Sequence, residues 1–282
     1  MSELTMRDTT ATLATARLKG QPRSGVPSWL RWGSWGPTLI TFVLAALLWQ
    51  VVAWTNPYVL PTLEAIGVSL VDDAGMYWSN FLVTLLEVVV GASAGILAGF
   101  LLAVVMAEFQ IIERAVMPLV IIVMVTPIVA IAPALVVAFG FGMVPKFIVT
   151  GLVVFFPMLV NSLAGLRDVD QKAMDVFKTL HASRWEIFRE LRFPGSMPYV
   201  FAGLRIALPL AVVGAAVAEF VAAGQQAGLG SLVTTSAAQA NLPVTWASIS
   251  LLCLLGVLLI IVLALVRKRV LWWSDGEVTA KG

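Results

Sequence analysis

Charged residues are scarce in this sequence. Aspartate, glutamate, lysine and arginine make up 12% of its 282 residues, whereas 60% are apolar and the mean hydropathy is +0.94. Because soluble domains are roughly a quarter charged, this composition excludes an ordinary water-soluble domain and predicts that the chain lies in a lipid bilayer. The net charge of +2 gives no reason to expect a nucleic-acid partner.

Cysteine and histidine are nearly absent. Cys253 is the only cysteine and His181 the only histidine, so the sequence excludes an intrachain disulfide, a multi-cysteine metal site and a histidine zinc site. Cys253 lies in an apolar run and is interpreted as a small core residue. No glycine-rich Walker loop is found, and no nucleophile, base and orienting group come together, so we predict neither ATP binding nor catalysis by this chain.

Long apolar runs, by contrast, are abundant. Each is long enough to cross a hydrocarbon core, which needs about 20 helical residues, and none shows the two-residue alternation of a barrel strand. The runs cover residues 37–54, 82–106, 115–139, 147–166, 206–223 and 246–266. The sequence therefore predicts an all-α, polytopic membrane protein with six transmembrane helices, several of them kinked by proline.

The remaining segments divide the chain into three parts. Residues 1–35 are predicted to form a largely disordered tail, residues 36–270 the transmembrane domain, and residues 271–282 a short C-terminal tail.

Lysine and arginine set the predicted orientation. They are absent from residues 55–80 and 219–243 but gather in the N-terminal tail, in the loop between Arg167 and Arg192, and at residues 267–269. Because cytoplasmic segments carry the excess of these residues, both termini are expected in the cytoplasm, with Lys146 as the only cation on the outside.

The loop at residues 167–198 is the most informative segment. Its pattern predicts a helix, a tight turn and a second helix, in which Ser183 and Glu186 have the spacing of a capping box and Pro194 ends the second helix. Apolar residues recur at helical spacing on both sides of the turn. Such a loop is expected to present an amphipathic knob that docks into a groove on a partner.

Several motifs resemble the permease subunits of bacterial ABC importers, in the group for nitrate, sulfonates, taurine and related pyrimidine, riboflavin or aromatic-acid compounds. The resemblance covers about residues 60–270 and rests on Thr179-Leu-His-Ala-Ser-Arg-Trp185, the proline-rich run from Thr126, Phe155-Phe-Pro-Met-Leu-Val-Asn161 and Gly228-Leu-Gly-Ser231. In the loop, Asp175 stands where this family has glutamate and His181 where it has glycine. Glycine supplies a left-handed turn there, a conformation that costs histidine more.

The resemblance implies a type I importer permease of the bacterial inner membrane. It implies partners: a second permease copy, two ATPase subunits that hold ATP and magnesium, an extracytoplasmic solute-binding protein, and membrane lipid. It also implies that the loop couples the permease to the ATPase. The coupling residues on this reading are Asp175, Phe177, Lys178, Thr179, Leu180, His181, Ala182, Ser183 and Trp185.

Polar residues at membrane depth are candidates for the translocation path or its gate. They are Glu219, Thr126, Asn161, Ser162 and Glu87. Each also has a structural interpretation: Glu219 as a cap for the helix that follows, Glu87 as a residue at the membrane interface, and the other three as helix-packing contacts.

Two other functions stay open at this point. An ion-driven secondary transporter is expected to show inverted repeats and midplane charges, and a membrane scaffold would use the same knob for another partner. The sequence identifies neither the solute nor whether the permease forms a homodimer or a heterodimer.

Overall fold

A computed structural model describes residues 32–222 and 227–272, and every element in these ranges is helical. The chain divides into two compact units, with the boundary in the sequence after Pro57. The first unit contributes one helix, α2 (Trp32–Thr55), which begins within the predicted tail and carries the first predicted crossing. The rest of the N-terminal tail, and residues 273–282 of the C-terminal tail, lie outside the described residues.

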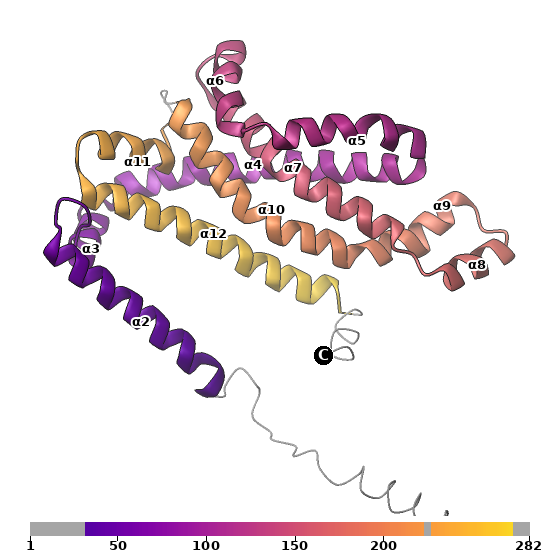
Figure 1. Cartoon of the computed structure of the whole chain (residues 1–282), viewed down its shortest axis with the longest axis horizontal. Coiled ribbons are helices and arrows are strands. Elements are labelled where there is room, and N and C mark those ends of the chain that lie inside the picture. Colours follow the sequence, from indigo (N-terminus) through magenta and orange to yellow (C-terminus); the bar gives the residue numbers. More distant parts are fainter. Residues whose placement is uncertain (1–31, 223–226, 273–282) are drawn as a thin grey trace, which may run out of the picture. The chain divides into compact units, whose positions relative to one another are not determined.

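The second unit holds the remaining helices (Figure 1). In chain order they are α3 (Leu63–Asp72), α4 (Ala74–Glu108), α5 (Gln110–Val125), α6 (Ile128–Phe139), α7 (Met143–Arg167), α8 (Gln171–Thr179), α9 (Arg184–Ile187), the π-helical turn η2 (Phe188–Arg192), α10 (Phe193–Val221), α11 (Leu229–Ala238) and α12 (Leu242–Val270).

The helices confirm an all-α polytopic membrane protein and correct one predicted crossing. Within residues 32–222 and 227–272, five helices are long and apolar enough to span a membrane, and α5 and α6 together make a sixth span only if it is bent by 97°. The predicted crossing over residues 115–139 is therefore not one kinked helix but two helices, divided at Thr126 and Pro127. Thr126 is extended at φ −69° and ψ 125°, because a residue before proline avoids the helical region and Pro127 has no N–H to continue the helix.

Helices α4, α7 and α10 pack together as the core of the second unit. Gly91, Gly95 and Gly99 recur every fourth residue along α4 and face α7. A side chain at Gly95 would place its Cβ 2.2 Å from the carbonyl oxygen of Gly151. The two backbones therefore meet directly, as small-residue stripes allow in membranes.

Apolar side chains fill the contact between these helices and cover their outer faces. The buried cluster contains Val88, Ala92, Val154, Ala207, Ala211, Val212, Ala215 and Leu255. Most of α12, in contrast, is exposed, and this includes Cys253, so its interpretation as a core residue is wrong. An apolar helix surface of this kind is suited to lipid or to another membrane-embedded chain.

Lysine and arginine side chains gather at one end of the second unit, where carboxylates lie among them. The end that carries α8 and α9 also carries the C-terminus of α4, the N-terminus of α5 and the junction of α7 with α8, whereas α11 lies at the far end of α10 (Figure 1). At the α8–α9 end lie Arg114, Arg167, Lys172, Lys178, Arg184, Arg189 and Arg192. The far end holds Glu64, Asp72 and Asp73, and the one described lysine near it, Lys146, is buried.

Candidate functional site: the α8–α9 loop, a pocket and a buried charge cluster

The loop between α7 and α10 forms the predicted helix, turn and helix. Leu180 to Ser183 connect α8 to α9. The N–H of Ala182 donates to the oxygen of Phe177, and the N–H of His181 donates to the oxygen of Lys178, both at 3.0 Å. These two bonds make a Schellman motif, which satisfies carbonyl groups at the end of α8.

His181 occupies the left-handed position of this motif, with φ at 54°. That position normally takes glycine, because a Cβ is disfavoured there. The structure therefore places histidine in the left-handed conformation that the family resemblance implies for this position.

Ser183 caps α9 as predicted. Its hydroxyl oxygen accepts from the N–H of Glu186 at 3.2 Å, and the Glu186 carboxylate accepts from the N–H of Ser183 at 2.6 Å. Both bonds of a capping box are present, so the start of α9 is fixed by its own sequence.

Pro194, in contrast, does not end the second helix. The chain passes from α9 through η2 directly into α10, where Pro194 lies in the first turn. The N–H of Phe193 donates to the oxygen of Phe188, which widens the helix by one residue. A π-type turn accommodates the proline ring and its missing N–H without breaking the helix, so α9 and α10 form one continuous element.

The loop exposes large apolar side chains. Leu180 is 72% exposed and Trp185 is 67% exposed. The Trp185 ring stacks on Phe188, with the ring centroids 5.6 Å apart, so it is held in place although it faces outward. We call the loop surface formed by Val176, Leu180 and Trp185 the apolar knob.

The other predicted coupling residues surround the knob. Lys178 pairs with Asp175 at 3.2 Å, and the Thr179 hydroxyl donates to the oxygen of Asp175 at 2.9 Å. Phe177 and Ala182 are half-buried. All the predicted coupling residues therefore lie on one contiguous loop.

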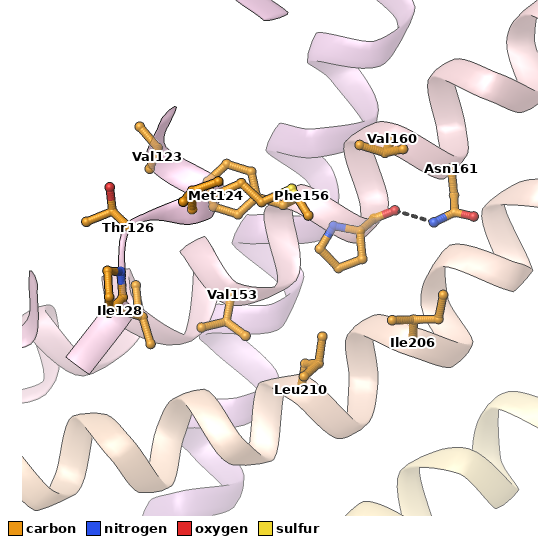
Figure 2. Close-up of a pocket in the computed structure, with 13 residues that line it drawn as sticks. Val123, Met124, Thr126, Ile128, Val153, Phe156, Val160, Asn161, Ile206 and Leu210 are labelled. Atoms are coloured by element: carbon orange, nitrogen blue, oxygen red, sulfur yellow. Dashed lines mark hydrogen bonds between the residues drawn. The ribbon is translucent and has the colours of Figure 1, made fainter. Parts of the chain in front are cut away.

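A pocket of about 530 Å³ opens at the break between α5 and α6. Figure 2 shows Thr126 at this break and Asn161 on the opposite side, where α7 and α10 form the wall. The amide Nδ2 of Asn161 donates to the oxygen of Pro157 at 2.7 Å. The other lining residues are apolar: Val123, Met124, Val125, Pro127, Ile128, Val153, Phe156, Pro157, Val160, Ile206 and Leu210.

The structure thus brings two of the predicted pathway residues, Thr126 and Asn161, to one pocket. Ser162 is fully buried and does not line it, and its hydroxyl has no hydrogen-bond partner among the described residues.

Glu219 is buried where α10 meets α11. Its carboxylate accepts from the Thr84 hydroxyl at 2.7 Å and from the N–H of Ser231 at 3.0 Å. Thr84 in turn accepts from the N–H of Leu229 at 2.8 Å. Two side chains from α4 and α10 therefore cap the first turn of α11, whose free N–H groups attract a carboxylate.

Glu87 lies beside this cap and forms an ion pair with Lys146. The Lys146 ammonium is 2.8 Å from the Glu87 carboxylate, and both side chains are buried, at 1% and 0% exposure. Glu87 also interacts with Glu219. We call Thr84, Glu87, Lys146 and Glu219 the buried charge cluster.

Sequence reasoning found Glu87 and Glu219 but missed Thr84 and the pairing with Lys146. One signal for this pairing was available in the sequence: Lys146 is the only cation predicted to lie on the outside. A lone lysine among apolar residues requires a carboxylate if it is buried.

Comparison with known proteins agrees with this geometry. A family model described as a binding-protein-dependent transport system inner membrane component matches residues 95–272. This range includes the whole α8–α9 loop, all the pocket residues, and Lys146 and Glu219.

Individual relatives resemble most of the chain. The formylaminopyrimidine transport permease protein of Halalkalibacterium halodurans is 35% identical over 225 residues, which are 79% of this chain and 89% of that protein. A probable ABC transporter permease protein of Haemophilus influenzae is 32% identical over 84% of this chain and 96% of its own length. The taurine transport system permease protein of Escherichia coli is 27% identical over 86% of this chain and 91% of its own.

Proposed function

The chain belongs to the family of binding-protein-dependent transport system inner membrane components, and we propose that it is the permease subunit of an ATP-driven importer for a small organic solute. As a multi-pass membrane protein it provides the route through the bilayer. The energy comes from two separate ATPase subunits, which bind ATP and magnesium, and an extracytoplasmic binding protein delivers the solute.

The apolar knob is the observation that carries this proposal. Leu180 and Trp185 expose large apolar surface on a loop whose backbone is fixed by the Schellman motif and the capping box. An ordered apolar protrusion outside the membrane core is suited to a groove on a soluble partner. In this family of proteins, the partner is the ATPase.

The charge distribution supports a cytoplasmic place for the knob. The basic side chains gather at the α8–α9 end of the second unit, together with Arg267, Lys268 and Arg269 in the last turn of α12. Because lysine and arginine are concentrated on the cytoplasmic side of membrane proteins, we place both termini in the cytoplasm and α11 outside.

We place the translocation path along the pocket at the α5–α6 break, with Thr126 and Asn161 as its polar groups. The apolar side chains of α5 beside the pocket are exposed, among them Ile121, Ile122 and Val125. A second copy of this chain covers this surface and completes the path. Ser162, Glu87 and Glu219 support it from inside the helix bundle without facing it.

The pocket lining also favours one class of solute. Neither lysine nor arginine lines it, so it offers no counter-charge to an inorganic anion. Among the solutes that the relatives are named for, an uncharged heterocycle such as a pyrimidine fits this lining better than nitrate or taurine. Competition for uptake between these compounds tests this choice, and stronger competition by nitrate or taurine would contradict it.

The proposal is tested by the ATPase that copurifies with the chain. Leu180→Arg places a charge on the apolar knob, and Asp175→Lys reverses the charge at its edge. Both are expected to reduce the copurified ATPase at least tenfold and to abolish solute-dependent ATP hydrolysis in liposomes. Leu180→Arg buries a charge at an apolar interface, which is costly, and Asp175→Lys replaces the partner of Lys178 by a like charge.

Val71→Arg is the matched control. Val71 is also apolar and is 77% exposed, but it lies near the end of α3, away from both the knob and the α5 surface. The control is expected to retain the ATPase. Full ATPase recovery with both knob variants would refute the coupling assignment.

A further inference from the structure

Two adjoining cavities lie between the α8–α9 loop and the neighbouring ends of α4, α5 and α7. Their volumes are about 400 and 320 Å³. They share Ala107, Gln110, Met174 and Arg192, so they form one recess with two lobes. We call this recess the basic cavity.

Basic side chains dominate its lining. Lys178 and Arg184 line the larger lobe, Arg167 lines the smaller one, and Arg192 lines both, whereas Glu108 is the one acidic residue in either lining. The remaining lining residues are uncharged. The cavity is therefore a concave, positively charged site, and it differs in charge from the apolar pocket at the α5–α6 break.

Ion pairs neutralise three of the four lining cations and leave one positive charge. Arg192 pairs with Glu108 at 2.6 Å, Lys178 pairs with Asp175 at 3.2 Å, and Arg167 pairs with Glu113. Arg184 forms no ion pair within the described residues. The four lining cations therefore outnumber by one the three carboxylates that pair with them, Glu108, Asp175 and Glu113.

Arg192 also has one N–H donor without an acceptor. Its Nε is buried and finds no acceptor among the described residues. A buried donor without an acceptor is unfavourable, and an oxyanion in the cavity that Arg192 lines would supply one. Guanidinium groups bind phosphate through several N–H groups at once.

We propose that the basic cavity binds a phosphate group, either as the headgroup of an anionic lipid or as free phosphate. The cavity lies beside the ends of α4 and α7, at the border of the membrane-spanning helices. On the orientation given under the proposed function, this border is the cytoplasmic leaflet, whose anionic lipids attract clustered lysine and arginine. A phosphate bound by Arg184 and Lys178 on the loop and by Arg167 on α7 connects the α8–α9 loop to the membrane-spanning helix α7.

Binding is measured on the purified full-length chain in a neutral maltoside detergent, without ATPase. The probes are dioctanoyl phosphatidylglycerol, dioctanoyl phosphatidylcholine and inorganic phosphate. Arg184→Gln removes the lining arginine that has no ion pair, and because Arg184 is exposed its loss leaves the fold intact. Arg189→Gln is the matched control, since Arg189 lies on the adjoining turn, pairs with Glu190 and lines neither lobe.

We expect phosphatidylglycerol to bind more tightly than phosphatidylcholine, and Arg184→Gln to weaken that binding about tenfold, the usual effect of losing one charge-assisted hydrogen bond. The control is expected to change it less than about twofold. Binding of inorganic phosphate with the same dependence on Arg184, and no preference between the two lipids, would identify free phosphate as the source.

Two results would overturn the proposal: no binding of any probe, or equal weakening by Arg184→Gln and Arg189→Gln. Because the assay contains no ATPase and no solute, such a failure leaves the importer assignment standing. Failure of the knob variants to release the ATPase would, conversely, leave phosphate binding intact.

Discussion

The ion pair of Lys146 with Glu87 is the most demanding contact at the scale of single residues. Both side chains are buried, and taking two charges out of water is costly unless they remain paired. The pair also lies beside Glu219, so loss of the ammonium leaves two carboxylates close together. This contact joins α7 to α4 next to the cap of α11.

Replacement of Lys146 by methionine should therefore destabilise the protein strongly. We expect a loss of about 3–5 kcal/mol, the usual cost of leaving a buried charge without its partner. Adding Glu87→Gln to Lys146→Met removes the orphaned carboxylate, so the double variant should recover much of the stability. The measurement is the apparent melting temperature in detergent, followed by tryptophan fluorescence; losses in the double variant equal to the sum of the two single losses would contradict the pairing.

His181 makes a second prediction at this scale. His181→Gly should stabilise the turn by about 1 kcal/mol, because glycine adopts a positive φ without the cost of a Cβ. His181→Pro is the contrasting variant, since proline cannot reach φ 54° and lacks the N–H that donates to Lys178. Hydrogen exchange of the α8–α9 loop should slow or stay level in the first variant and speed up in the second; faster exchange in His181→Gly would show that the turn depends on the histidine side chain.

Residues could be predicted from the sequence where the cause was local. The capping box of Ser183 and Glu186 follows from a spacing of three, and the left-handed turn at His181 was expected from the family resemblance, which has glycine at that position. Lys146 and Glu87 are 59 positions apart, so their pairing depends on how α4 packs on α7. No local pattern contains that information.

At the scale of elements, the contact of α4 with α7 depends on the absence of side chains. Gly95→Ala places a methyl group 2.2 Å from the Gly151 oxygen, which forces the two helices apart. We expect a loss of about 1–3 kcal/mol, typical of overpacking. Gly75→Ala on the same helix meets nothing within 4 Å and should be neutral or slightly stabilising; equal melting temperatures for the two variants would contradict the close contact.

Elements were predicted well where hydropathy decides and less well where backbone geometry does. Among the described residues, apolar length located every helix that is long and apolar enough to span a membrane, and also the bent pair α5 and α6. It could not reveal that Pro127 divides one of them by a 97° bend, while Pro194 is absorbed into a π-turn within a continuous helix. A proline thus breaks one helix and not another, according to whether the helix can widen around it.

At the scale of the whole molecule, the second unit is polarised along its helices. The lysine and arginine side chains collect at the α8–α9 end, and α11, with its buried cap, lies at the other end (Figure 1). The positions of lysine and arginine in the sequence predicted this polarity. The positive-inside rule needs only the order of the crossings and the cations in the segments between them.

The orientation can be tested with the one native thiol removed. In a Cys253→Ala background, Gln239→Cys places a thiol at the end of α11, and Lys172→Cys places one on α8; both positions are exposed. A membrane-impermeant maleimide applied to spheroplasts should label Gln239→Cys, because the proposed orientation places that end outside. It should label Lys172→Cys only after the membrane is permeabilised, since the α8–α9 loop must face the compartment where ATP is present. The opposite labelling pattern would place the apolar knob outside the cell, where no ATPase could reach it, and would rule out coupling through this loop.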